Sequence, residues 1–358
     1  MPALRSTKAL LRPLRLRRQS KPPRLLPKRT EKARAVALTT EGIAVVSGLT
    51  TLTSSPSTKR VPVTGRLKRY IPGAIFVAPA VVLFFMFVAY PLVRGVYLSF
   101  FRWAGYGNPV FIGARNYQSL LEDPIFRRAL VVTLSYTVVA SVLQTVVPMF
   151  IAILLMQRWR GGTIFRTLIF VPAVVSLTIT GLLWQLALQP DGGIVNQMLG
   201  DIGLRSLQGQ WLASTTAVVP VIILVSLWQS LGFYMLIFYA GLQNIDPALY
   251  ESGRMDGANA WQLVRYVTIP LLRPVTVIVV TLNIINGLKV FDLIFAMTSG
   301  GPGHASESLG TYLYGLAFGS ANGATAAFGY ANAIGVVIMV GAAAAMLFQA
   351  RFRAGRAQ

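Results

Sequence analysis

The chain has 358 residues, of which 54% are hydrophobic and 12% charged, whereas soluble proteins average about 45–50% apolar and about 25% charged residues. This composition excludes an ordinary soluble domain, and the absence of cysteine with a single His304 excludes disulfides, thiolate metal sites and multi-histidine metal clusters. Residues 1–69 hold 17 of the 33 Lys and Arg behind the formal charge of +22, so the charge does not by itself indicate a nucleic-acid partner.

Residues 1–69 are predicted to form a basic, disordered cytoplasmic tail. They are rich in Arg, Lys, Pro, Ser and Thr, and Glu41 interrupts their one mildly apolar run. Beside a membrane such a tail attracts anionic lipid headgroups, at about 1 kcal/mol per Lys or Arg, which makes membrane lipid a nearer partner than nucleic acid. A solvated tail, or a wrongly chosen start codon, is the favoured alternative.

Six stretches are long and apolar enough to cross a membrane. A spanning helix needs about 20 apolar residues, because the hydrocarbon layer is about 30 Å thick and a helix rises about 1.5 Å per residue. The stretches run approximately over Tyr70–Tyr90, Ala129–Met156, Phe165–Leu188, Thr215–Tyr239, Val275–Met297 and Phe328–Phe348. Each must be helical, since an isolated strand in lipid leaves its backbone groups unpaired. The predicted fold class is an all-α membrane protein with six transmembrane helices.

Lys and Arg in the loops predict the orientation, because they are retained on the cytoplasmic side during insertion. With the N-terminus inside, the cytoplasmic segments carry nine Arg beyond the tail, against six on the other side. Residues 59–69 add five positive charges beside the first helix, which usually dominates topology. We therefore expect both termini to be cytoplasmic.

The first outer segment, from Pro91 to Arg128, mixes aromatic and polar residues, as in Ser99-Phe100-Phe101-Arg102-Trp103. Aromatic rings favour the headgroup level of a bilayer. This pattern predicts a segment at the membrane interface.

The cytoplasmic segment 241–274 has the strongest local signals in the chain. Asp246 and Pro247 predict an N-cap followed by proline at the first helical position, and hence a short helix through Met255. Asp256-Gly257 ends that helix, because glycine takes the backbone angles of helix ends and tight turns.

A second helix is expected after this turn. Trp261, Val264 and Val267 recur at spacings of three along one face, and Ile269-Pro270 is expected to stop the helix. The segment is thus predicted to form two short amphipathic helices at a sharp angle on the cytoplasmic surface.

This pattern resembles the EAA coupling loop of binding-protein-dependent ABC importer permeases, which reads Glu-Ala-Ala, then Asp-Gly-Ala, then Ile-x-Leu-Pro. The residues at its motif positions are Glu251, Ser252, Gly253, Asp256, Gly257, Ala258, Ile269 and Pro270. Ser252 and Gly253 stand where alanines are usual, and Gly253 weakens the helix by up to about 1 kcal/mol relative to Ala. A generic surface helix-turn-helix is the alternative interpretation.

The resemblance extends from about Tyr70 to Phe352 and points to the carbohydrate-uptake branch, in particular the larger subunit of maltose-type permeases and its counterparts in glycerol-phosphate and oligosaccharide importers. The residues that carry it are Tyr90-Pro91, Leu98-Ser99-Phe100, Asn116-Tyr117, Asp123-Pro124, Phe165-Arg166, Pro172, Gly192-Gly193-x-x-Asn196, Trp228, Gly232-Phe233, Phe291-Asp292, Thr298-x-Gly300-Gly301-Pro302 and Phe328-Gly329-Tyr330.

The resemblance implies a type I ABC importer permease fold in the bacterial inner membrane. Its implied partners are a second permease subunit, a cytoplasmic ATPase dimer that docks on the coupling loop, and an extracytoplasmic solute-binding protein. ATP is used by the partner, so this chain needs no cofactor and is not an enzyme. The solute would be a sugar or a related polar molecule.

Polar residues inside the fourth and fifth spans are candidates for the solute path. They are Gln229, Tyr234, Asn283, Asn286, Lys289 and Asp292. The last four recur at spacings of three, which predicts one helix face, and Lys289 is expected to pair with Asp292 because a charge at membrane depth costs about 2.5–3.5 kcal/mol. Hydrogen bonding between this subunit and partner helices is an equally strong interpretation.

The turn from Thr298 to His304 follows the fifth span. By resemblance it would touch the extracytoplasmic binding protein, although a plain helix-ending turn explains its glycines equally well. His304 is interpreted as a solvated loop residue rather than a ligand or catalyst.

Other classes of function find little support. The phosphate-binding pattern Gly-x-x-x-x-Gly-Lys is absent, as are His-Glu-x-x-His and Gly-x-Ser-x-Gly. A stand-alone secondary transporter or channel is the main alternative, but such proteins commonly show an internal repeat, and none is seen here. We expect a tail (1–69), a six-helix domain (70–352) and a short basic C-terminal tail (353–358).

Overall fold

The structure of the protein is a computed structural model that describes residues 75–156, 161–319 and 327–354. The chain divides into two units, Met1–Arg69 and Tyr70–Gln358, and every described residue belongs to the second. The predicted N-terminal tail therefore lies outside the described residues, as do residues 355–358 of the predicted C-terminal tail.

Four helices in the described part of the chain are long and apolar enough to cross a membrane. They are Ile75–Leu98, α4 (Pro124–Met156), α8 (Val218–Gln243) and α15 (Phe328–Ala354). Two bent pairs raise the number to as many as six: α5 (Gly162–Val174) with α6 (Leu177–Ala187), bent by 95°, and Ala260–Leu271 with α12 (Arg273–Leu288), bent by 65°. The predicted all-α membrane fold is confirmed, with two of its spans broken.

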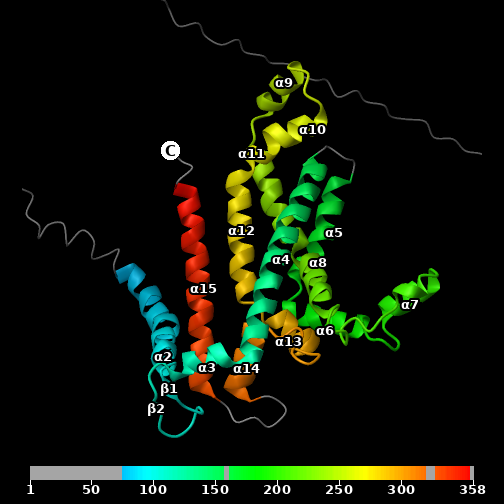
Figure 1. Cartoon of the computed structure of the whole chain (residues 1–358). Coiled ribbons are helices and arrows are strands. Elements are labelled where there is room, and N and C mark those ends of the chain that lie inside the picture. The colour runs from blue at the N-terminus through cyan, green and yellow to red at the C-terminus, as the bar shows by residue number, and fades with distance from the viewer. Residues whose placement is uncertain (1–74, 157–160, 320–326, 355–358) are drawn as a thin grey trace, which may run out of the picture. The chain divides into compact units, whose positions relative to one another are not determined.

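Shorter elements connect these helices. They are β1 (Phe101–Arg102), β2 (Val110–Phe111), α3 (Arg115–Glu122), α7 (Ile194–Asp201), the 3₁₀ helix η2 (Arg205–Leu207), α9 (Pro247–Met255), α10 (Ala260–Leu263), α11 (Ile269–Leu271), α13 (Asp292–Thr298) and α14 (Leu309–Phe318). Within the unit that begins at Tyr70, α9–α11 lie at one end with the C-terminal end of α15, and α3, α13 and α14 lie toward the opposite end (Figure 1).

The helix bundle is centred on α4, which packs along α8 and α12. Glycines permit the closest helix contacts: a Cβ added at Gly287 of α12 would lie 2.9 Å from the Cα of Thr137 in α4, and one at Gly232 of α8 would lie 2.5 Å from the Ile169 carbonyl oxygen in α5. Phe238 and Met235, also in α8, are fully buried. The packing of α8 and α12 along α4 places the polar faces of these three helices beside one another.

The third predicted span, Phe165–Leu188, is not one continuous helix. Val175 and Ser176 both have extended backbone angles, and the Ser176 hydroxyl accepts a hydrogen bond from the Ile179 N–H, which starts α6 as a new helix. Serine at an N-cap position favours such a start. The prediction missed the break because the apolar composition continues through it.

The fifth predicted span, Val275–Met297, is also interrupted. Helix α12 ends at Leu288, Lys289 takes non-helical angles, and α13 begins only at Asp292. Of the four polar residues predicted to share one helix face, two therefore lie in α12, Lys289 lies in the connection, and Asp292 starts α13.

Two prolines lie inside helices close to a predicted helix end. The first span was predicted to end at Tyr90, but the helix continues through Pro91 to Leu98. The helix after the α9 turn ends at Leu271, one residue beyond the predicted stop at Ile269-Pro270. In both cases a π-helical turn lies directly upstream, η1 (Phe85–Ala89) and η3 (Val264–Thr268). A wider turn moves the carbonyl of residue i−4 away from the proline ring, which removes the clash that normally breaks a helix.

The predicted interface segment 91–128 contains short ordered elements. Strand β1 pairs antiparallel with β2, with Phe101 opposite Phe111. The Asn116 side-chain amide donates to the carbonyls of Ser99, at 2.7 Å, and Phe101, at 3.0 Å, and so ties α3 to this hairpin. The two short strands are an addition to the predicted all-α architecture.

Candidate functional site

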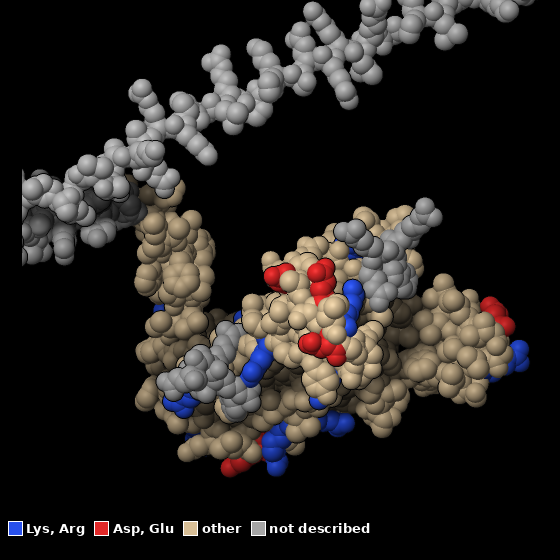
Figure 2. Space-filling view, turned by 90° about the horizontal axis from the view of Figure 1, so that it is seen from above, with Lys and Arg blue, Asp and Glu red and all other residues tan. Residues whose placement is uncertain are grey.

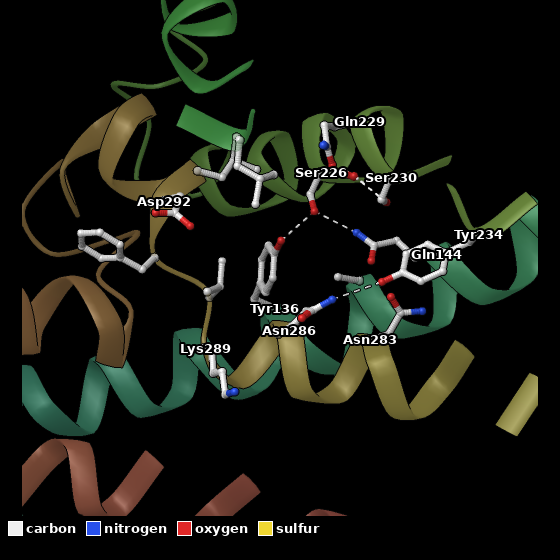
Figure 3. Close-up of a pocket in the computed structure, with 16 residues that line it drawn as sticks. Tyr136, Gln144, Ser226, Gln229, Ser230, Tyr234, Asn283, Asn286, Lys289 and Asp292 are labelled. Carbon is white, nitrogen blue, oxygen red and sulfur yellow. Dashed lines mark hydrogen bonds between the residues drawn. The ribbon is translucent and has the colours of Figure 1, made fainter. Parts of the chain in front are cut away.

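A cavity of about 300 Å³ lies between α4, α8, α12 and the first residues of α13 (Figure 3). All six residues predicted for a solute path line it: Gln229, Tyr234, Asn283, Asn286, Lys289 and Asp292. The fold thus brings together residues from α8, α12 and α13. Their contact with a solute stays a prediction.

The predicted ion pair between Lys289 and Asp292 does not form. Both side chains are exposed, no ion pair joins them, and Figure 3 shows them pointing in different directions. The reason is the end of α12 at Leu288: spacing by three places two side chains together only while the helix continues. The cavity therefore presents one cationic and one anionic group separately.

Helix α4 forms a wall of the cavity that the sequence prediction missed. Tyr136, Ala140 and Gln144 recur at spacings of four and all line the cavity. The Ser226 hydroxyl of α8 accepts hydrogen bonds from the Tyr136 hydroxyl and from the Gln144 amide nitrogen, each at 2.8 Å. The polar spacing within the second span was the available signal, because i, i+4 residues share a helix face.

The amides of the cavity are only partly engaged. Asn286 donates to the Tyr234 hydroxyl at 3.5 Å, and Gln229 donates to the Val175 carbonyl at the α5–α6 bend at 3.3 Å. Asn283 donates to the Thr145 hydroxyl at 3.3 Å, but its Oδ1 is buried without a hydrogen-bond partner. An unpaired buried amide oxygen costs free energy and favours a conformation or a ligand that donates to it.

The chemistry of this cavity suits the binding of a hydroxyl-rich molecule. Its walls offer amides, hydroxyls and aromatic rings, which hydrogen-bond hydroxyl groups and cover apolar ring faces. The described residues contain no group of three or more side chains able to hold a metal ion.

The helix α9 begins and ends as its sequence predicts. The Asp246 carboxylate accepts from the Ala248 N–H at 2.9 Å, Pro247 is the first helical residue, and Gly257 has a φ of 80° just after the helix. The Ala258 N–H then donates to the Gly253 carbonyl at 2.9 Å, which closes the helix end.

Gly253 is a contact between the two short helices. A Cβ added there would lie 2.6 Å from Cδ2 of Leu263 in α10. The Tyr250 hydroxyl also lies 3.2 Å from the Thr268 hydroxyl. Gly253, which stands where alanine is usual in the motif, therefore leaves room for Leu263 of α10. The sequence analysis considered only that this glycine weakens α9.

The residues predicted to share a face of the second helix differ in burial: Val264 and Val267 are half-buried, whereas Trp261 is 62% exposed. The buried residues of this helix are Leu263 and Thr268. The π turn η3 explains the change, because a wider turn rotates the following residues relative to an α-helical pattern. Ile269 and Pro270 lie beyond this turn and continue the helix.

The motif residues of α9 lie on the surface at one end of the described unit. Glu251, Ser252 and Asp256 are exposed. Figure 2, which views this end, shows acidic and basic side chains among a largely uncharged surface. Large apolar side chains are also exposed, with Met255 at 87% and Tyr266 at 73%. A surface that mixes apolar and charged groups in this way is suited to a protein partner.

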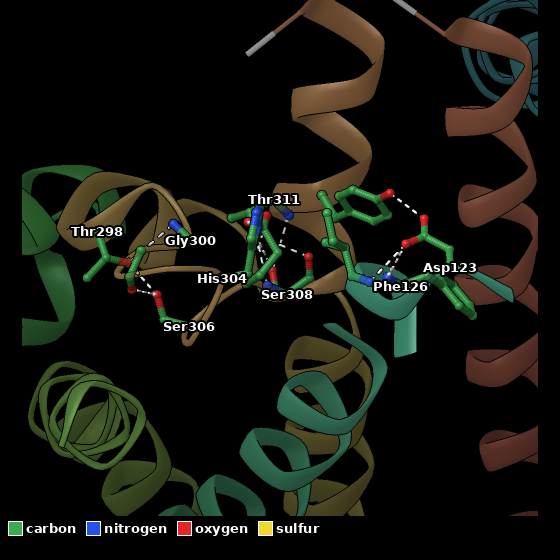
Figure 4. A network of polar contacts seen from close by, with 12 residues as sticks. Asp123, Phe126, Thr298, Gly300, His304, Ser306, Ser308 and Thr311 are labelled. Atoms are coloured by element: carbon green, nitrogen blue, oxygen red, sulfur yellow. Dashed lines mark hydrogen bonds and ion pairs between the residues drawn. The ribbon is translucent and has the colours of Figure 1, made fainter. Parts of the chain in front are cut away.

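The turn that begins at Thr298 is internally hydrogen-bonded (Figure 4). The Thr298 and Ser306 hydroxyls lie 2.7 Å apart, and Ser306 donates to the Gly301 carbonyl at 2.5 Å. His304 Nδ1 lies 3.0 Å from the carboxylate of buried Glu307, and its side chain is 49% exposed. His304 is thus exposed, as expected for a solvated loop residue, and it also contacts Glu307.

Asp123 joins three elements at the same end of the protein. Its carboxylate caps α4 by accepting from the N–H groups of Ile125 and Phe126, and it accepts from the hydroxyls of Tyr312 in α14 and Tyr330 in α15. Burial alone would raise the pKa of Asp123, but these four hydrogen bonds outweigh it and lower the pKa below its usual value. Burial and the adjacent carboxylate raise the pKa of Tyr312.

The comparisons with known proteins agree with one another and cover most of the chain. Residues 144–357 match the family described as binding-protein-dependent transport system inner membrane component. The chain is 35% identical to the probable ABC transporter permease protein YurN of Bacillus subtilis, over 78% of this chain and 94% of YurN. It is 33% identical to the lactose transport system permease protein LacF of Rhizobium radiobacter, over 76% of this chain and 92% of LacF.

Two solved structures have a similar fold. One is a bacterial ABC transporter involved in the import of the acidic polysaccharide alginate, with a TM-score of 0.71 at 24% identity over 82% of this chain and 99% of the matched chain. The other is a bacterial alginate ABC transporter in complex with an alginate pentasaccharide-bound periplasmic protein, with a TM-score of 0.70 at 25% identity over 80% of this chain and 95% of the matched chain.

Proposed function

Because this chain belongs to the family of binding-protein-dependent transport system inner membrane components, we propose that it forms the membrane path for a sugar or related polar solute. The family predicted from the coupling-loop motif is thereby confirmed, and the chain is a transport subunit of the inner membrane, not an enzyme. Relatives named for transport of lactose and of arabinooligosaccharides support a carbohydrate as the solute.

The cavity between α4, α8 and α12 is the observation that carries this proposal. Its uncharged amides and hydroxyls match the hydroxyl groups of a sugar, and the buried Oδ1 of Asn283 is an acceptor without a donor. A solute hydroxyl would supply that donor, so solute binding would relieve the cost of the unpaired oxygen.

The partners follow from the family. An extracytoplasmic binding protein delivers the solute, a second permease subunit completes the path, and a cytoplasmic ATPase dimer uses ATP. We propose that the ATPase docks on the motif residues of α9–α11, because their exposed carboxylates and large apolar side chains lie together at one end of the unit.

Uptake by the assembled transporter in proteoliposomes tests the solute path. Replacing Asn283 or Asn286 by Ala is expected to raise the KM for solute about tenfold, since each removes one hydrogen bond of about 1.4 kcal/mol. The matched control is Thr167→Ala, an exposed residue of α5 outside the cavity lining. Unchanged KM and rate in both cavity variants would assign these amides to helix packing instead.

Co-purification tests the alternative of a stand-alone secondary transporter or channel, which the family membership does not favour. A second permease and an ATPase are expected to be recovered with this chain from native membranes. Recovery of the chain alone, with solute uptake independent of ATP, would contradict the proposed function.

A further inference from the structure

The Gly192-Gly193-x-x-Asn196 run organises the segment between α6 and α8, which the proposed transport function does not explain. Asn196 is 8% exposed. Its Nδ2 donates to the Pro190 and Gly209 carbonyls, at 3.2 and 3.1 Å, and its Oδ1 accepts from Trp211 Nε1 at 2.9 Å. One side chain thereby ties together residues on both sides of α7.

Close backbone contact holds the start of α7 in place. A Cβ added at Gly193 would lie 2.2 Å from the Gln189 carbonyl oxygen, and Gly192 has a φ of 81°. Helix α7 is therefore fixed to the chain that leaves α6, and Figure 1 shows it set off to the side of the bundle.

This scaffold presents an apolar ridge outward. Ile194, Met198 and Ile202 recur at spacings of four and are 59%, 61% and 67% exposed. Gln197 and Asp201 are exposed as well and lie along the adjoining edge of the helix, with Asp201 three residues from Met198. The exposed surface of α7 therefore has an apolar edge beside a polar edge.

Tryptophans surround the place where α7 meets the bundle. Trp184 of α6, Trp228 of α8 and Trp211 line an apolar recess of about 230 Å³ together with Val195 of α7. The indole of Trp211 keeps its polar edge on Asn196 while its ring faces the recess. Tryptophan is enriched where a membrane protein crosses from hydrocarbon to headgroups, because its ring is apolar and its N–H is polar.

We propose that α7 lies in the plane of the membrane interface, with Ile194, Met198 and Ile202 in the acyl chains of the leaflet at that end of the bundle. Lipid is the occupant because the ridge continues the surface of a membrane span. Leu182, Leu183 and Leu186 of α6 are exposed, and the recess joins α6 to α7. An amphipathic helix of this kind buries its apolar face at the headgroup boundary.

Spin labels on the assembled transporter test this placement. This chain has no cysteine, so an introduced cysteine is its single labelling site, and any cysteines of the partner subunits are replaced by serine beforehand. Met198→Cys places a label on the ridge, and Gln197→Cys is the matched control one residue away on the polar side. The transporter is placed in vesicles of phosphatidylethanolamine and phosphatidylglycerol. Relaxation of each label is then measured with oxygen, which concentrates in lipid, and with a water-soluble nickel chelate.

Oxygen is expected to relax the Met198 label several-fold more than the nickel chelate does, with the reverse order at Gln197. Equal access of the nickel chelate to both labels would place the ridge in water and overturn the proposal. A Met198 label that neither reagent reaches would mean that a protein partner covers the ridge, and would overturn it too. In the Asn196→Leu variant the difference between the two labels is expected to disappear.

Discussion

The α9–α11 segment and the cavity differ in how far apart in the sequence the residues lie whose contacts build them. In the segment, Tyr250 meets Thr268 across 18 residues and Asn259 bonds Gln262 across three. In the cavity, Gln144 reaches Ser226 across 82 residues, and Asn283 of α12 bonds α4 across 138. The segment is therefore shaped locally, whereas the cavity exists only after α4, α8 and α12 have packed.

The comparison implies different responses to mutation. A change in the segment is expected to alter coupling to the partner while the membrane bundle stays folded. A change at the cavity walls is expected to alter stability and solute binding together, because the same hydrogen bonds serve both.

The largest loss of stability is expected from Gly232→Ala in α8. Its Cβ would approach the α5 backbone to 2.5 Å, and overpacking against backbone costs about 1–3 kcal/mol. The control is Gly341→Ala in α15, where nothing lies within 4 Å and helix propensity favours Ala by about 1 kcal/mol. Thermal unfolding in detergent should show a lower Tm for the first variant only; equal Tm values would mean that the cavity wall does not depend on this contact.

A loss of similar or smaller size is expected from Ser226→Ala. It leaves the buried Tyr136 hydroxyl and Gln144 amide without their acceptor, at about 1–3 kcal/mol for an unsatisfied group. Ser230→Ala removes only bonds to the carbonyls of Ser226 and Leu227 in the same helix and serves as the control. Unfolding free energies in mixed micelles measure both, and a Ser226 variant as stable as the control would contradict the importance of long-range bonds.

Gly257→Val tests the segment. The glycine has a φ of 80° and open space around it, so valine introduces only backbone strain, roughly 1–2 kcal/mol in the left-handed region. We expect the bundle to retain its Tm while solute uptake and ATP turnover become uncoupled. Gly257→Asn, which tolerates these angles, should stay coupled. Normal coupling in the valine variant would remove the assigned role of this turn.

The smallest effect is expected at Asp123, whose tyrosine partners lie 189 and 207 residues away. Its lowered pKa stabilises the folded state above the unfolded pKa, about 3.9, and this contribution disappears as pH falls through the lower folded value. Asp123→Asn should therefore have a lower Tm than the native protein at pH 6–8, with the difference vanishing in acid. A difference that persists unchanged in acid would assign the effect to geometry instead of charge.

Local signals in the sequence predicted the α9 region well. The Asp246 cap, Pro247 and Gly257 act through their own and adjacent backbone groups, so their effect does not depend on the rest of the fold. The predicted end of the first span at Tyr90 was wrong, because a π turn upstream of Pro91 accommodates its ring and the helix continues to Leu98. The predicted stop at Ile269-Pro270 was one residue early.

The cavity was predicted in part. Polar residues in apolar spans identified its α8 and α12 walls, since such residues need a partner or a polar cavity. The α4 wall was missed, and the expected Lys289–Asp292 pair does not form because α12 ends at Leu288, before both residues. Which side chains meet depends on where helices end and how they pack. The spacing of residues in the sequence predicts neither property.

By itself the sequence determined that the chain is a helical membrane protein and where α9 begins and ends, because hydropathy, caps and glycines act over a few residues. The tertiary structure decided the breaks in two spans, the partners of Ser226 and Asn283, and the outward ridge of α7. The partners of Ser226 and Asn283 lie 82, 90 and 138 residues away in the chain, and a local pattern has no information about such distances.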